Sequence, residues 1–147
     1  EVLLISPWYF NHEMAARLAG AAVREVPAAS AEGFVPSLEA IAKAWSPQTR
    51  ALVLVHPSNP TGACYSGAWI DGLSRMMEGD RRWSRVWLLV DQTYQEIYFG
   101  EAPPESPAGR KPLRERTVTV GSFSKCFGLA GWHDQALGST TVMCWFV

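Results

Sequence analysis

The stretch ALVLVHPSNPTG, residues 51–62, joins an uninterrupted apolar run to a turn rich in proline and polar residues. The run has the length of a strand. Because it does not alternate with polar residues, it predicts a strand covered on both faces, as in a parallel sheet packed between helices. The prolines at 57 and 60 and the glycine at 62 predict a rigid turn directly after it. Ligands of parallel sheets bind outside the carboxyl ends of the strands, so this turn is a candidate ligand-binding segment.

The same order of apolar run and polar turn recurs on both sides of this stretch. Further strands are predicted at 2–5, 22–26, 86–90 and 117–120, and helices at 12–20, 38–44 and 67–77, with Asn11, Ser37 and Ser66 as N-caps. Residues 102–112 contain four prolines and are expected to form a loop. Strands and helices alternate at intervals of roughly thirty residues, which is typical of βαβ units. The sequence therefore predicts an α/β fold, a mostly parallel sheet with helices on both faces.

Composition and charge narrow the classes of function. The chain of 147 residues is 48% hydrophobic and 18% charged, with a formal net charge of -1, and its basic residues do not gather in a patch. This composition indicates a globular protein without a nucleic-acid partner. The apolar runs are too short to span a bilayer, so no membrane association is expected.

Cysteine usage and the first residues bear on the compartment. The three cysteines lack metal-type spacing, which argues against a zinc site or a disulfide framework and favours a reducing compartment. We therefore expect no metal site and a cytoplasmic location. The chain lacks an initiator methionine and begins as if inside a strand, so we expect a piece of a larger protein, which could have lost an organellar targeting segment.

Chemically versatile residues follow three of the predicted strands: Asn59, Asp91 and Lys125. Lys125 lies beside aromatic residues in a glycine-flanked loop, where desolvation would free its amine as a nucleophile; an ordinary surface lysine is the alternative. Asp91 ends a buried run and needs a partner, for which a protonated pyridine nitrogen would serve; a helix N-cap is the alternative. Asn59 would be a rigidly presented donor, or only part of a turn.

Two tyrosines and two serines complete the candidate set. Tyr94 lies on the same side as Asp91 if that segment is helical, and Tyr9 could stack on a flat ring; a packed core aromatic is the alternative for both. Ser122 and Ser124 flank the lysine closely enough to hydrogen-bond a phosphate. The tetrapeptide SFSK also spells S-x-x-K of serine acyl-enzymes, but the accompanying S-D-N and K-T-G are absent from the sequence.

In combination, SPWYFNH, HPSNPTG, DQTYQEIYF and GSFSKCFGLAGW resemble the large domain of class I/II aminotransferases. These are enzymes of fold type I that depend on pyridoxal 5'-phosphate (PLP), and the order NPTG, D-x-x-Y, SFSK is highly specific to them. The resemblance implies an incomplete PLP-dependent transferase-like large domain over residues 1–132. It also implies transfer of an amino group from an amino acid to a 2-oxo acid. A catalytically inactive fragment, or another fold type I enzyme such as a lyase or decarboxylase, is the alternative.

The resemblance further implies roles for individual residues. Lys125 would bind PLP as a Schiff base and move the proton of the substrate. Asp91 would keep the ring nitrogen protonated. Tyr94 and Asn59 would hydrogen-bond the phenolic oxygen of the cofactor, and the Asn59–Pro60 bond would be cis.

The remaining implications concern the phosphate, the end of the chain and the partners. Tyr9 would stack on the ring, and Ser122, with Ser124, would contact the phosphate. An arginine that clamps the phosphate in the family is replaced by His133, which is a poor substitute for a guanidinium. Residues 133–147 follow no pattern of the family, so we expect a non-matching tail. Family members are well over twice as long and are homodimers, which implies a homodimeric full-length protein.

Overall fold

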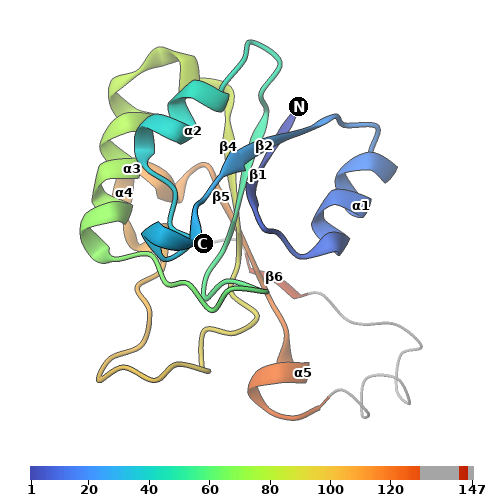
Figure 1. The fold of residues 1–147 in the computed structure, drawn as a ribbon, viewed down its shortest axis with the longest axis vertical. Coiled ribbons are helices and arrows are strands. Elements are labelled where there is room, and N and C mark those ends of the chain that lie inside the picture. The colour runs from blue at the N-terminus through green and yellow to red at the C-terminus, as the bar shows by residue number, and fades with distance from the viewer. Residues whose placement is uncertain (130–142, 146–147) are drawn as a thin grey trace.

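The structure is a computed structural model that describes residues 1–129 and the backbone of 143–145. A six-stranded sheet of order β2-β1-β3-β4-β5-β6 forms its centre (Figure 1). The strands are β1 (Val2–Ser6), β2 (Val23–Pro27), β3 (Ala51–Val55), β4 (Trp87–Asp91), β5 (Thr117–Gly121) and β6 (Met143–Trp145). Strands β1 to β5 are paired in parallel, and β6 runs antiparallel to β5. The predicted α/β class and the mostly parallel sheet are confirmed.

Helices cover both faces of the sheet, as the sequence predicts (Figure 1). Helix α1 (Phe10–Leu18) lies on one face, and α2 (Leu38–Ala44), α3 (Gly67–Gly79) and α4 (Lys111–Arg114) lie on the other. A further helix, α5 (Phe123–Cys126), follows β5. Short 3-10 turns occur at η1 (Ser30–Glu32), η2 (Arg81–Arg85) and η3 (Pro107–Gly109). No helix within the described residues is long and apolar enough to cross a membrane.

The main core lies between the sheet and α2 and α3. Apolar residues recur on α3 at helical spacing, with Ile70, Leu73 and Met77 buried. They pack in one cluster with the inward-facing residues of the central strands and with Trp83 of η2. The strand residues of this cluster include Leu52, Leu54, Leu88 and Val90. This packing fixes the central strands, and therefore the loops at their carboxyl ends.

Two of the three expected helix caps are confirmed. The hydroxyl of Ser37 accepts a hydrogen bond from the N–H of Ala40 at 3.1 Å, and that of Ser66 accepts one from Trp69 at 3.2 Å. The Asn11 cap is wrong, because α1 already begins at Phe10. The Asn11 amide instead donates to the hydroxyl of Tyr9 at 2.8 Å.

The expected loop at 102–112 contains two short helical segments, η3 and α4. Pro107 and Pro112 lie in the first turns of these segments, where a missing N–H costs no hydrogen bond. Arg110 anchors the region, since its guanidinium pairs with Asp71 at 2.8 Å and with Glu105 at 2.6 Å. The density of prolines predicted a break in regular structure but not the helical starts that proline also allows.

Candidate active site

The predicted site residues follow neighbouring parallel strands, so they gather along one edge of the sheet (Figure 1). Tyr9 follows β1, Asn59 follows β3, Asp91 ends β4, and Lys125 follows β5. Because β1, β3, β4 and β5 are adjacent in that order, the loops after them are neighbours. The carboxyl edge of this sheet is therefore the candidate active site.

Asn59 and Tyr94 meet directly. The Asn59 amide nitrogen lies 3.2 Å from the Tyr94 hydroxyl, although 35 residues separate the two positions in the chain. The turn that carries Asn59 closes with Gly62 at a φ of 71°, a conformation that favours glycine. The Asn59–Pro60 bond is cis, as expected. Tyr94 lies in a turn rather than in the helix that its spacing from Asp91 suggested.

Asp91 is 9% exposed and has two partners. The backbone N–H of Thr93 donates to Oδ1 at 3.0 Å, and Nε2 of His12 lies 3.1 Å from Oδ2. Burial raises the pKa of Asp91, but the close approach of His12 and the hydrogen bonds from Thr93 outweigh it, so the net shift of its pKa is downward. Asp91 therefore stays ionised although it is buried. The bond to Thr93 is a local turn contact, so Asp91 does not cap a helix.

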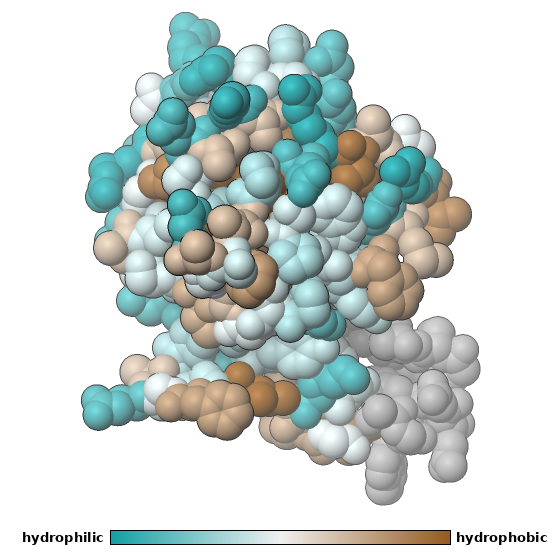
Figure 2. All heavy atoms as spheres, viewed as in Figure 1, coloured by the Kyte–Doolittle hydropathy of each residue, from teal (hydrophilic) through white to brown (hydrophobic). Residues whose placement is uncertain are grey.

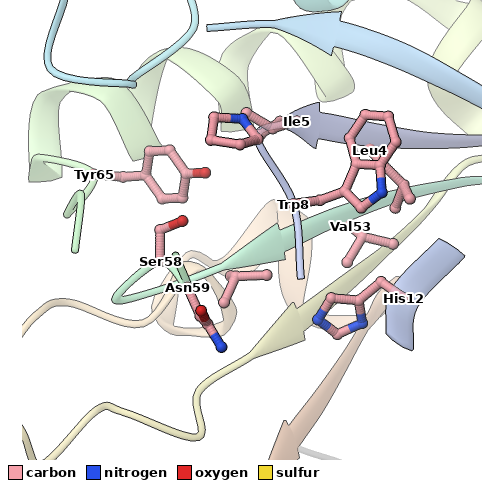
Figure 3. A pocket seen from close by; sticks show the side chains of 10 residues that line it. Leu4, Ile5, Trp8, His12, Val53, Ser58, Asn59 and Tyr65 are labelled. Carbon is pink, nitrogen blue, oxygen red and sulfur yellow. The ribbon is translucent and has the colours of Figure 1, made fainter. Parts of the chain in front are cut away.

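His12 is a site residue that the sequence reasoning missed. It follows Tyr9 by three positions and lies on the inner side of α1, so its place in SPWYFNH was the available signal. The ring of Tyr9 stands edge-on to that of His12, with centroids 5.8 Å apart. His12 and Asn59 both point into a small cavity of about 10 Å³, roughly the room of one water molecule (Figure 3). Nε2 of His12 has no well-aligned hydrogen bond within the described residues, despite its short distance to Asp91.

Lys125 lies on α5 and is exposed, so the desolvation expected from its aromatic neighbours is absent here. The hydroxyl of Ser122 accepts a hydrogen bond from the N–H of Ser124 at 3.2 Å and caps α5. The thiol of Cys126 donates to the carbonyl of Thr93 at 3.3 Å, which ties α5 to the turn after Asp91. Among the described residues, no hydrogen bond joins Lys125 or Ser124 to Asp91.

A wide groove opens beside the Asn59–Tyr94 pair. It has a volume of about 670 Å³ and lies between the turn after β3 and the segment 94–104. Ile97, Tyr98 and Phe99 line it and are exposed. Figure 2 shows apolar surface along this lower edge of the molecule, where Figure 1 places the segment and α5. The edge therefore combines partly buried polar pairs with an open apolar groove, which suits an organic ligand that carries a few polar groups.

Comparisons with known proteins agree on one family. A profile of the aminotransferases of class I and II matches residues 1–145. The match runs past Trp132. The predicted boundary between the partial domain 1–132 and the tail 133–147 lies outside the described residues and stays a prediction.

Individual relatives give the same result. The aspartate/prephenate aminotransferase of Thermus thermophilus is 36% identical over 134 residues, which are 90% of this chain and 33% of that protein. The arginine–pyruvate transaminase of Pseudomonas aeruginosa is 34% identical over 145 residues, 98% of this chain and 35% of that protein. The crystal structure of an aspartate aminotransferase from Rhizobium meliloti superimposes with a TM-score of 0.82 at 30% identity, and covers 90% of this chain and 33% of that one.

The chain thus spans about a third of the length of the curated relatives it matches. The profile match extends over nearly all of it, including Asn59, Asp91 and Lys125, and the shared fold covers 90% of it. The chain belongs to the class I and II aminotransferases.

Proposed function

We propose that this chain is part of a PLP-dependent aminotransferase, which moves an amino group from an amino acid to a 2-oxo acid. The observation that carries the proposal is the position of Asp91, which is buried and ionised at the same sheet edge as the Asn59–Tyr94 pair. A carboxylate kept charged in a buried place is suited to a cationic partner. Membership of the family supports the ring nitrogen of PLP as this partner.

The residues present are chemically suited to PLP. An ionised Asp91 would pair with the protonated ring nitrogen, and the amide and hydroxyl of Asn59 and Tyr94 would bind the phenolic oxygen. Tyr9 would lie against the ring, and Ser122 and Ser124 would contact the phosphate. When bound, PLP supplies an electron-withdrawing ring that stabilises negative charge on the alpha carbon of an amino acid.

The protein's own groups would then have separate tasks. Asp91 would keep a proton on the ring nitrogen by its negative charge, and His12 and Thr93 lie against the two carboxylate oxygens of Asp91. The amine of Lys125 would hold the aldehyde of the cofactor and would serve as the base that moves a proton at the alpha carbon of the substrate. The bond from Cys126 to Thr93 supports the position of α5, which carries that amine.

The activity of the whole protein extends beyond this chain, because the relatives are about three times as long. We propose residues 1–132 as the partial cofactor-binding domain and 133–147 as a tail that departs from the family pattern. The full-length protein would be a homodimer, and its substrates would be an amino acid and a 2-oxo acid, as the names of the aspartate/prephenate and arginine–pyruvate enzymes indicate for those relatives.

Labelling of the chain tests the cofactor part of the proposal. The chain is incubated with PLP, reduced with borohydride to fix any lysine-bound aldehyde, and digested for peptide mass analysis. The sequence contains only three lysines, so the modified position is unambiguous. We expect labelling at Lys125 alone, its loss in Lys125→Arg, and its retention in the matched control Lys43→Arg. Labelling spread over Lys43, Lys111 and Lys125 would overturn the assignment of Lys125.

A second experiment separates the transaminase from its alternatives. The full-length protein is loaded with PLP and given amino acids without a 2-oxo acid, and the cofactor is recovered. A transaminase converts the cofactor to pyridoxamine phosphate, whereas a lyase or decarboxylase returns PLP. A chain labelled at Lys125 whose full-length form converts no amino acid would identify an inactive member of the family.

A further inference from the structure

A second cavity lies at the same edge of the sheet, and of the residues that line it only Ser122 and Cys126 have a role described above. Its volume is about 180 Å³, several times the roughly 30 Å³ that a water molecule occupies in the liquid. The residues that line it include Gln92, Thr119, Ser122, Phe123, Cys126 and Phe127. They come from the end of β4, from β5 and from α5, so the cavity adjoins the helix that carries Lys125.

The cavity opens on the face of the sheet opposite to Asp91. Thr119 is in register with Val90, and Val90 packs in the core under α3. Successive residues of a strand point to opposite faces, so Asp91 points to the face of α1 and Gln92 points back to the face of Val90 and Thr119. The contacts agree, since Asp91 meets His12 of α1 and Gln92 meets Ser106 before η3. The two sites therefore lie back to back across the sheet edge.

Two buried polar atoms in this cavity lack partners within the described residues. Gln92 is 7% exposed, and its Oε1 accepts from the hydroxyl of Ser106 at 3.2 Å, but its amide nitrogen Nε2 donates to nothing. Oγ1 of Thr119 is buried and equally without a partner. Buried polar groups are nearly always hydrogen-bonded in native proteins. The amide N–H of Gln92 and the hydroxyl of Thr119 can both donate to one oxygen acceptor of a ligand.

The residues around the cavity indicate which kind of ligand could carry this acceptor oxygen. Phe123 and Phe127 are 37% and 63% exposed, and their rings lie 5.7 Å apart, which offers apolar surface to a flat group. Glu96 also lines the cavity and is exposed, and its negative charge disfavours an anion there. We propose that this cavity binds a small, uncharged aromatic amide, whose carbonyl oxygen accepts from Gln92 and Thr119 and whose ring packs against Phe123 and Phe127.

Benzamide is a suitable probe, and two of the three cysteines, Cys126 and Cys64, provide a local readout on the whole chain. Cys126 lines the cavity, whereas Cys64 is exposed in the turn after β3. Alkylation by iodoacetamide is followed at both cysteines by peptide mass analysis, at increasing concentrations of benzamide. We expect benzamide to slow alkylation of Cys126 in a saturable way and to leave Cys64 unchanged. Benzoate, which has the same ring and a negative charge, should protect Cys126 more weakly.

Variants link this protection to the unpartnered atoms. Thr119→Val removes one hydrogen bond and should raise the benzamide concentration for half-protection about fivefold. Gln92→Glu keeps the acceptor for Ser106 but replaces the donor, and should raise it about tenfold. Gln48→Val is the control, since Gln48 is exposed and lies away from the cavity near Glu1. Because the Thr119 hydroxyl has no partner to lose, valine should leave the melting temperature unchanged or raise it.

The proposal is overturned if benzamide fails to slow alkylation of Cys126, or slows Cys64 equally. It is also overturned if benzoate protects Cys126 as well as benzamide does. The same holds if benzamide protects Cys126 of the Thr119→Val variant at the same concentration as in the wild type. A fall in the melting temperature of Thr119→Val would show that the hydroxyl already has a partner, and would equally overturn it. None of these outcomes depends on PLP labelling at Lys125, so the two proposals fail independently.

Discussion

Replacing the buried carboxylate by its isosteric amide, Asp91→Asn, separates structure from function at the sheet edge. In the wild type, Asp91 accepts from the Thr93 N–H at 3.0 Å and lies 3.1 Å from Nε2 of His12. An amide keeps an oxygen for Thr93 but turns its NH₂ group toward Nε2 of His12 and loses the negative charge that a cationic ring nitrogen requires. We therefore expect a nearly intact fold and a large loss of PLP labelling at Lys125.

The cost to stability follows from these contacts. A hydrogen bond to a charged group contributes about 1.5–3 kcal/mol and a neutral one about 0.5–1.5 kcal/mol, so the exchange at the Thr93 contact is expected to lose about 1–1.5 kcal/mol. Relief of the buried charge offsets part of this loss. For a chain of this size the melting temperature should fall by no more than roughly 6 °C.

The stability difference between the wild type and Asp91→Asn should depend on pH. The pKa of Asp91 is lowered from its ordinary value of 3.8, so its stabilising contribution is fully present above that value and is lost as the pH falls through the lowered pKa. The variant has no such group, so its deficit relative to wild type should be largest near neutral pH and should shrink below pH 3.8. Melting curves by circular dichroism between about pH 7 and pH 3 measure this difference.

Two results would refute the reasoning. A loss of more than about 3 kcal/mol would show that the charge of Asp91 is needed for folding rather than for a ligand. Undiminished labelling at Lys125 would show that Asp91 has no part in holding the cofactor. The matched control is Asp71→Asn, which removes a carboxylate that is paired with Arg110 away from the sheet edge.

Three further variants test other parts of the structure. Burial lowers the pKa of His56 from its ordinary value of 6.5, so the wild type should lose stability as the pH falls below that value. The variant His56→Asn keeps an acceptor for the Tyr65 N–H and should not show this loss. Melting temperatures of both proteins near pH 7 and pH 5 decide this. Trp83→Ala should cost about 3–5 kcal/mol in urea unfolding, because the side chain is fully buried, and a cost below about 1 kcal/mol would contradict that packing. Gly62→Ala should cost about 1 kcal/mol through its φ of 71° alone, since a methyl group there meets no neighbour, and an unchanged urea midpoint would argue against this turn.

Much of the fold was predictable because its signals are local. The uniform apolar runs at 51–55 and 86–90 predicted strands covered on both faces, and serine before an apolar helical repeat predicted the caps at Ser37 and Ser66. The errors were local as well. Asn11 is not the N-cap because α1 begins one residue before it. Two prolines of 102–112 lie in the first turns of helical segments, a position that proline allows as readily as it breaks a helix.

The sequence by itself determined the class of fold, the family and the identity of Asn59, Asp91, Tyr94 and Lys125 as candidates. Residue types and their order are properties of the chain, so they can be read without coordinates. Only the tertiary structure decided which groups touch. The contact of Asn59 with Tyr94, the approach of His12 to Asp91 and the tie from Cys126 to Thr93 join residues more than thirty positions apart. These contacts exist because parallel strands place the loops that follow them at one edge, and the alternation of side chains along β4 and β5 then decides which face each group meets.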